Sequence, residues 1–405
     1  MRQIPDQDSL QHLMLSSPRC HQVYLPRKQE ILACVLKAQY GDLLDLPEAI
    51  TAVRSQGLLF QDHKEEAIAL LDAWRRPEEI SELALTPSSR MDKPKSLEEI
   101  IKLLQMFKQL HFFLEDYATN APRPAWISPA EWEHKLPLQL TSTEKRRFLR
   151  ALCRLQILAN IFGLPETDRP FEGPDNDWDR IGSPEATDAF RLFYGTMPPW
   201  EYEEMGCVWS YLFSKYDLIA QEISVDLRNL MSNCGCDFFW EIYPDDQRVP
   251  FGCGMEIVSN LDHFSQHFDT YIAIGPVFLY RVLHADRLTR RNMIMINTRV
   301  GEDITFIGDG LWVDWEERMP FIEPADRYKT PDFEIFWSLL PPIEQPSPAW
   351  KKTWIVPHAP ETDFEDTVDF YTHSDRDWTW GYALWDGERL EEWKVPSWRV
   401  PGLRA

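Results

Sequence analysis

The segment 140–163 constrains the fold more than any other part of the chain, because it combines helix-start, helix-stop and buried-face signals. Thr141, followed three residues later by Glu144, forms a capping-box pattern that predicts a helix beginning near Ser142. Gly163, with Pro165 close behind it, predicts the end of that helix. Between these limits apolar residues recur at the spacing of a buried helix face: Phe148, Leu149, Leu152, Leu155, Ile157, Leu158, Ile161 and Phe162.

This helix also carries basic residues that we expect to be mostly exposed: Lys145, Arg146, Arg147, Arg150 and Arg154. Their spacing places Arg147, Arg150 and Arg154 in one row beside the apolar stripe. In a chain of net charge −23, this row has two interpretations. It pairs with acidic side chains of its own fold, which is the commoner outcome for a core helix, or it binds a polyanion.

A second long helix is expected after Pro199, running to about residue 231 with a wide apolar stripe. We expect it to pack against the helix at 140–163. Its first turn carries Glu201, Glu203 and Glu204, which complement the helix dipole. These carboxylates are the nearest plausible partners for the arginine row.

Helical periodicity extends through most of the first 230 residues, and Ser96 with Glu99 predicts a further capping box. After about Cys234 the sequence changes character, because ten of the 17 tryptophans lie beyond residue 300. Residues 271–283 are ambiguous, and 293–298 show β-like alternation. We therefore expect an α+β, mainly α fold, with a helical N-terminal half packed on a Trp-rich mixed C-terminal half. Its regions are 1–76, 96–231 and 232–405, or all of these form one compact unit.

Charge and cysteine usage narrow the class of protein. A pI near 4.9 argues against broad nucleic-acid binding, so no DNA partner is expected. Seven scattered cysteines do not form a disulfide framework. The first ten residues are polar, and no run of eighteen apolar residues occurs, so we expect a cytoplasmic protein without a membrane partner.

A zinc interpretation can be drawn from five residues after position 233: Cys234, Cys236, Cys253, His263 and His267. Thiolates and imidazoles are the ligands that zinc prefers, but Cys-x-Cys is not a strong paired spacing. Burial of these cysteines as small hydrophobes is the favoured interpretation. No phosphate-binding loop, dinucleotide fingerprint or nucleophile elbow is present, so we expect neither metal nor cofactor.

An acidic, aromatic segment is the strongest candidate for chemistry: Trp312, Asp314, Trp315, Glu316 and Glu317. Desolvation among rings raises the pKa of a carboxyl group and suits it to acid–base work. The same carboxylates and rings could instead bind a guanidinium group. A solvated acidic turn with tryptophan packed beneath it is the third interpretation.

Several stretches resemble a large group of uncharacterised fungal F-box-like proteins. Residues 16–36 are similar to the second half of an F-box-like region, without the Leu-Pro-x-Glu opening, and residues 380–390 are similar to the C-terminal signature of that group. The helix at 140–163 and residues 198–204 also fit it. This resemblance implies an F-box-derived protein-interaction or substrate-adaptor protein.

The chain also resembles fungal arginine-containing cyclodipeptide synthases in size and in lacking standard enzyme motifs. Residues 313–317 keep the second Asp and the Glu of that family's Asp-Asp-x-x-Glu motif, with Val at the first position. The resemblance implies an aminoacyltransferase that joins arginine from arginyl-tRNA to a second aminoacyl-tRNA and forms a diketopiperazine. Asp314 and Glu317 would then be catalytic, and Glu316, Trp315 and Trp312 would bind substrate. The tRNA would meet Lys145, Arg146, Arg147, Arg150 and Arg154.

Overall fold

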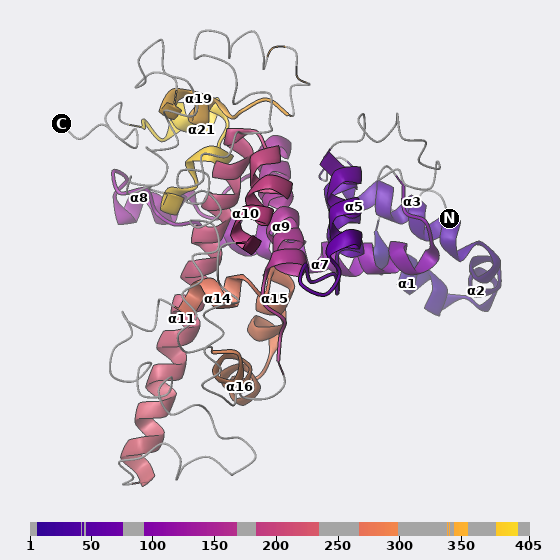
Figure 1. Cartoon of the computed structure of the whole chain (residues 1–405), viewed down its shortest axis with the longest axis horizontal. Coiled ribbons are helices and arrows are strands. Elements are labelled where there is room, and N and C mark those ends of the chain that lie inside the picture. Colours follow the sequence, from indigo (N-terminus) through magenta and orange to yellow (C-terminus); the bar gives the residue numbers. More distant parts are fainter. Residues whose placement is uncertain are drawn as a thin grey trace.

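A computed structural model describes residues 6–41, 43, 46–75, 93–167, 184–234, 267–298, 338, 340, 344–354 and 378–395. These residues fold entirely into helices, turns and connecting loops, with no strand among them (Figure 1). The mainly α part of the predicted fold class is therefore confirmed. The expected β component is not found within the described residues.

Helix α9 (Ser142–Phe162) lies at the centre of the molecule and begins and ends where the sequence predicts. The Thr141 side chain accepts the Glu144 N–H, and the Glu144 carboxylate accepts the Thr141 N–H at 3.0 Å. This is the reciprocal capping box. At the other end the Gly163 N–H donates to the Ala159 carbonyl at 3.2 Å.

The N-terminal helices are α1 (Gln7–Ser16), α2 (Pro18–Tyr24), α3 (Lys28–Tyr40), α4 (Leu46–Arg54) and α5 (Lys64–Arg75), with the short η1 (Leu25–Arg27) between α2 and α3. Helix α3 packs on α7 (Leu97–Asn120), and α4 packs on both α7 and α9. Ser96 caps α7 as predicted, but the Glu99 carboxylate bonds the Lys95 N–H and Arg54 instead of the Ser96 N–H. The second predicted capping box is therefore only half formed.

Helix α11 (Pro199–Cys234) packs along α9, which confirms the predicted pairing of the two long helices. It follows α10 (Pro184–Leu192) and η4 (Tyr194–Thr196). Figure 1 shows α11 continuing well past α9 toward α16.

The ambiguous segment 271–283 forms parts of α14 (Phe268–Ile272) and α15 (Pro276–His284). The predicted strand at 293–298 is wrong, because these residues lie in and just after α16 (Arg287–Asn297). The Asp286 carboxylate starts this helix by accepting the N–H groups of Leu288 and Thr289, each at 3.1 Å. The neighbours Ile294 and Met295 are both buried, as on a helix face and unlike the alternation of a strand.

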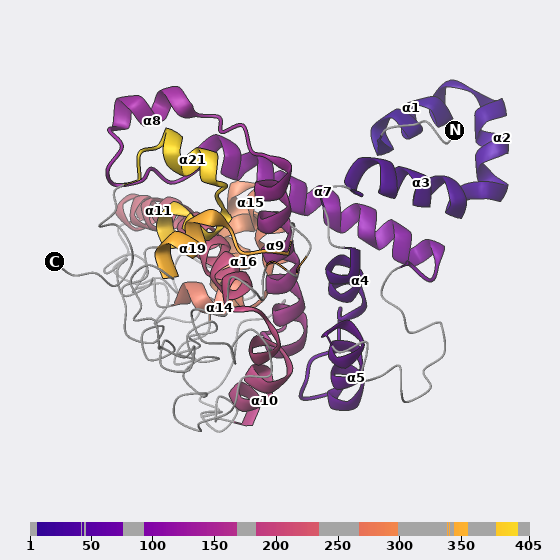
Figure 2. The same cartoon turned by 90° about the horizontal axis from the view of Figure 1, so that it is seen from above.

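The C-terminal described helices are α19 (Pro348–Trp354), η10 (Trp378–Trp380), η11 (Tyr382–Leu384) and α21 (Gly387–Glu392). Figure 2 shows α21 close to α8 (Pro129–Lys135). Aromatic rings join these elements: Trp132 meets Trp393 at a centroid distance of 5.1 Å, and Trp126 meets Trp380 at 4.9 Å. The expected tryptophan-rich packing is present.

Buried apolar side chains form one cluster that extends from Leu10 to Trp393. It draws on residues of all three predicted regions. The boundaries at 76, 96, 231 and 232 stay predictions.

Candidate functional site

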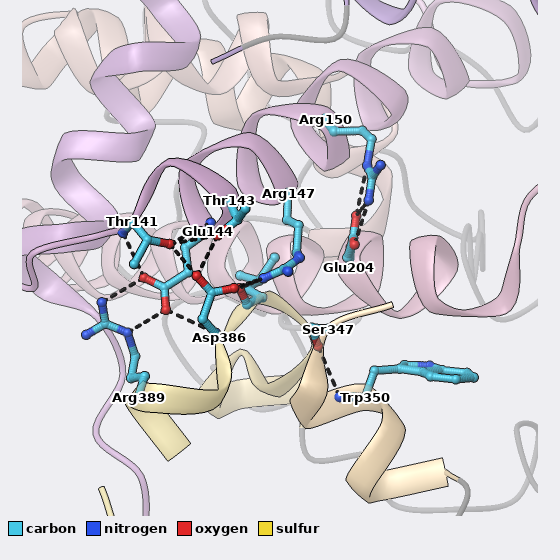
Figure 3. Close-up of polar contacts among 11 residues, drawn as sticks. Thr141, Thr143, Glu144, Arg147, Arg150, Glu204, Ser347, Trp350, Asp386 and Arg389 are labelled. Carbon is cyan, nitrogen blue, oxygen red and sulfur yellow. Dashed lines mark hydrogen bonds and ion pairs between the residues drawn. The ribbon is translucent and has the colours of Figure 1, made fainter. Parts of the chain in front are cut away.

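The arginine row of α9 lies inside the protein. Arg150 and Arg154 are only 2% and 1% exposed, and Arg147 is also buried. Three elements surround the row: the first turns of α11, helix α4, and the segment 378–395. Figure 3 shows the part of this arrangement that faces the C-terminal segment.

Arg150 binds Glu204 through two guanidinium nitrogens, with Nε at 3.1 Å from Oε2 and Nη2 at 2.7 Å from each carboxylate oxygen. Such a two-pronged pair is the strongest geometry an arginine and a carboxylate adopt. The third guanidinium nitrogen of Arg150, Nη1, lies 3.3 Å from Glu201. The planar fork of Arg150 is therefore occupied on both sides.

Arg154 lies one turn further along α9 and bridges two other elements. Its Nη1 is 2.6 Å from Glu201, and its Nη2 donates to Glu48 of α4 at 2.9 Å. Glu201 thus serves both arginines. Burial alone would lower the pKa of Arg154, but the charges of Glu201 and Glu48 outweigh burial and raise it.

The pKa of Glu204 is raised although this carboxyl group is paired with an arginine. Burial raises the pKa of this carboxyl group, and the nearby Glu201 adds to the rise, while Arg150 opposes it. The ionised pair is therefore held against a substantial desolvation cost.

Arg147 points the opposite way, toward the C-terminal segment. Its Nη1 donates to the Leu384 carbonyl at 2.9 Å and to Asp386 at 2.8 Å. The other Asp386 oxygen accepts hydrogen bonds from the hydroxyls of Thr141 and Thr143, at the start of α9. Burial alone would raise the pKa of Asp386, but these hydroxyls and Arg147 outweigh it, so the pKa lies below its ordinary value.

Glu144 has a second function beyond capping α9. It accepts the backbone N–H of Asp386 at 3.2 Å, and it binds Arg389 through Nε and Nη2, each at 2.7 Å (Figure 3). Asp386 is the N-cap of α21. The N-termini of α9 and α21 are therefore joined, each through a carboxylate supplied by the other.

Glu203 of α11 is fully buried and fastens the segment at two points. Its Oε2 accepts hydrogen bonds from Trp378 Nε1 and from the Tyr382 hydroxyl, both at 2.5 Å. The Trp378 ring lies against Gly206, where a Cβ atom would be 2.3 Å from the indole. Gly206 therefore makes room for this ring on α11.

The prediction that Arg147, Arg150 and Arg154 are exposed is wrong. The first turns of α11, helix α4 and the segment 378–395 cover the row. Arg150 and Arg154 pair with Glu201, and Arg150 also pairs with Glu204, which confirms these two expected carboxylate partners. Burial in these ion pairs argues against tRNA contact by the three arginines, because contact would require the pairs to open. Lys145 and Arg146 differ, since both are partly exposed.

The acidic aromatic segment lies outside the described residues, with Trp312, Asp314, Trp315, Glu316 and Glu317. The roles of these five residues stay predictions. Of the zinc candidates, Cys236, Cys253 and His263 also lie outside that part, and His267 is buried. Among the residues that the structure describes, no group of three or more histidine, cysteine or carboxylate side chains could hold a metal ion.

Sequence reasoning missed several residues of this site: Glu48, Asp386, Arg389 and Gly206. Only Gly206 carries a local signal, because a glycine inside a long apolar helix stripe indicates close approach by another group. The contacts of the other residues depend on which distant segments pack together, and no local sequence pattern predicts that.

No protein-family model, no curated protein and no solved structure matches this chain. Within its described part, no helix is long and apolar enough to cross a membrane. The site is therefore interpreted from its own geometry.

Proposed function

We propose that this chain is a non-catalytic, F-box-derived protein-interaction protein of the cytoplasm. The observation that carries the proposal is the closure of the arginine row. Arg147, Arg150 and Arg154 bind carboxylates of α4, α11 and the segment 378–395. Their ion pairs therefore connect α9 to its neighbours within the fold. The burial of these arginines removes three of the five cations that the tRNA-dependent alternative would use to contact phosphates, and an interaction protein does not need them at its surface.

A test of this proposal measures product and partner together. Extracts of cells that express the chain are analysed by mass spectrometry for arginine-containing cyclic dipeptides. In parallel, the purified chain is mixed with a purified ubiquitin-ligase adaptor and followed by light scattering. We expect no cyclic dipeptide. A product made by the wild type and lost in folded Asp314→Ala would overturn the proposal, whichever way the adaptor behaves.

A tRNA-dependent cyclodipeptide synthase is the second candidate, favoured by the partial exposure of Lys145 and Arg146 at the start of α9. These two cations would meet tRNA phosphates. The amine of one aminoacyl group would attack the ester carbonyl of the other, with the tRNA 3′-hydroxyl as leaving group. The free amine of the dipeptide would then attack the remaining ester, closing the ring and releasing the second tRNA.

In this second candidate Asp314 or Glu317 would take the proton of the attacking amine. Glu316, Trp315 and Trp312 would hold the arginine side chain. No cofactor is needed, because the aminoacyl ester is already activated. The variant Lys145→Glu would then use arginyl-tRNA less well while unfolding like the wild type, and full activity in that variant would remove the tRNA-binding role of Lys145.

A further inference from the structure

Three apolar side chains at the N-terminal end are the least covered of their kind in that part of the chain. Leu15 on α1 is 77% exposed, Val23 on α2 is 51% exposed, and Leu25 on η1 is 58% exposed. The following helix α3 buries Ile31, Leu32, Val35 and Leu36 in the core. Leu15, Val23 and Leu25 are therefore not part of the hydrophobic core that α3 helps to form.

These residues lie in a stretch of an acidic chain in which every formally charged side chain is positive. Residues 9–29 contain no carboxylate, while they contain Arg19, Arg27 and Lys28 together with two histidines. The net charge of the whole chain is −23. Arg19 is one helical turn before Val23, so both lie on the same face of α2. Arg19 and Arg27 are exposed.

The position of these helices suits a docking surface. Figures 1 and 2 both show α2 at the edge of the molecule opposite the C-terminal helices α19 and α21. The segment 378–395 and the arginine row of α9 lie in the body of the protein. A partner bound at α2 would leave that body undisturbed.

We propose that Leu15, Arg19, Val23, Leu25 and Arg27, here called the N-terminal patch, bind a partner protein through an acidic amphipathic helix. The inference rests on the proposed interaction function and names its surface and the chemistry of its partner. Helix α2 contacts both α1 and η1, so the three apolar side chains lie on adjoining elements. Contiguous exposed apolar surface rimmed by polar residues marks protein contacts. Because the flanking charges are positive, acidic residues beside the partner's apolar anchors complement them.

Nucleic acid fits this patch less well than an acidic helix does. Phosphate binding draws its affinity from many cations that follow the backbone. Here two arginines alternate with aliphatic side chains, and the one tyrosine of residues 9–29, Tyr24, is partly buried, which limits stacking with a base. An acidic amphipathic helix can contact both the apolar side chains and the arginines of the patch.

The test uses the full chain and two synthetic helical peptides with identical leucine positions, one with glutamate and one with lysine at the remaining positions. Fluorescence anisotropy measures binding. We expect the glutamate peptide to bind, with an affinity that falls about tenfold when salt rises to several hundred millimolar. The lysine peptide should bind at least about tenfold more weakly.

Variants assign the binding to the patch. Leu15→Ser/Val23→Ser/Leu25→Ser should lose the glutamate peptide, and Arg19→Glu/Arg27→Glu should shift the preference toward the lysine peptide. Leu218→Ser/Val225→Ser, a matched change at two exposed apolar positions of α11, should bind as the wild type does. All these side chains are exposed, so the variants should unfold at wild-type urea concentrations.

Three results would overturn the proposal. The first is that the two peptides bind equally or not at all. The second is that single-stranded RNA or anionic vesicles bind the wild type and not the patch variants, and the third is that the wild type is a dimer and the serine variant a monomer, because a second copy of the chain would then occupy the patch. If neither peptide binds and no cyclic dipeptide is made, the N-terminal patch is not the docking surface, but the proposed interaction function still stands. A cyclic dipeptide product would reject that function whatever the peptides do.

Discussion

Glu144 accepts the backbone N–H of Asp386 at 3.2 Å, across 242 residues of sequence. Asp386 in turn accepts the hydroxyls of Thr141 and Thr143 beside Glu144. Two helix N-termini, each with the positive end of its dipole, thus meet through two carboxylates. Arg147 and Arg389 balance the negative charge.

This junction predicts a pH-dependent stability. Because the folded-state pKa of Asp386 lies below its ordinary value of 3.8, the ionised group adds stability above that value. The contribution is lost as the pH falls through the lower folded-state pKa. We expect Asp386→Asn to reduce the free energy of unfolding at pH 7 by about 1 to 3 kcal/mol.

Urea unfolding at several pH values measures the effect of Asp386→Asn. The difference from the wild type should shrink as the pH falls below about 4. Glu392→Gln is the matched control on α21, since the Glu392 side chain is 56% exposed and its ion pair with Lys135 should contribute little. A constant difference across this pH range would contradict the assignment.

Arg150 gives a second prediction. Arg150→Met leaves Glu201 and Glu204 buried with less positive charge, and we expect a loss of about 3 to 5 kcal/mol at pH 8. Burial already raises the pKa of Glu204, so without Arg150 this group takes up a proton more readily. The loss should therefore be smaller at pH 5. Lys145→Met, a partly exposed cation on the same helix, should change the free energy of unfolding by less than about 0.5 kcal/mol.

Charge reversal of the whole arginine row cannot separate tRNA binding from folding. Glutamate at position 147 would place negative charge beside Asp386, and glutamate at positions 150 and 154 would place it beside Glu48, Glu201 and Glu204. We expect such a protein to be unfolded. Circular dichroism that shows native helix content in the triple variant would refute the fastening role of the row.

A buried hydroxyl gives a third prediction. The Tyr117 hydroxyl is buried and has no hydrogen-bond partner among the residues that the structure describes, whereas the Tyr211 hydroxyl donates to Asp116 at 2.6 Å. Removing an unsatisfied buried group is neutral or stabilising, and removing a satisfied one is costly. Tyr117→Phe should therefore be at least as stable as the wild type, and Tyr211→Phe should lose about 1 to 3 kcal/mol. Thermal unfolding that ranks the two variants in the reverse order would contradict this prediction.

The contact between Gly206 and Trp378 gives a fourth prediction. A methyl group at position 206 would overlap the indole ring, so Gly206→Ala should destabilise the protein by about 1 to 3 kcal/mol. With Trp378→Ala already present, the same change should become neutral or stabilising by up to about 1 kcal/mol, because alanine favours helix over glycine. The double-mutant cycle is measured by urea unfolding, and additive effects would show that the two residues do not meet.

The sequence predicts helix α9, its capping box and its pairing with α11, because spacing and local capping determine these features. It also identifies Glu201 and Glu204, which lie near the arginine row once the two helices pack. It does not predict Glu48 or Asp386, since their contacts depend on long-range topology. The predicted exposure of Arg150 is wrong because the pattern of one helix alone shows a polar face, while α4, α7, α11 and α15 all contact α9. The strand predicted at 293–298 is wrong because short apolar runs fit strand and helix equally well.

The junction of α9 and α21 also bears on the order in which the chain folds during synthesis. At the rates of translation, α9 leaves the ribosome many seconds before Asp386 and Arg389 do. Until then Arg147 and Glu144 lack their native partners, and α11 lacks the Trp378 ring. Fastening contacts of such long sequence separation form late and slow the search for the native state. A nascent chain that ends between these segments is therefore a species on which we expect chaperones to act.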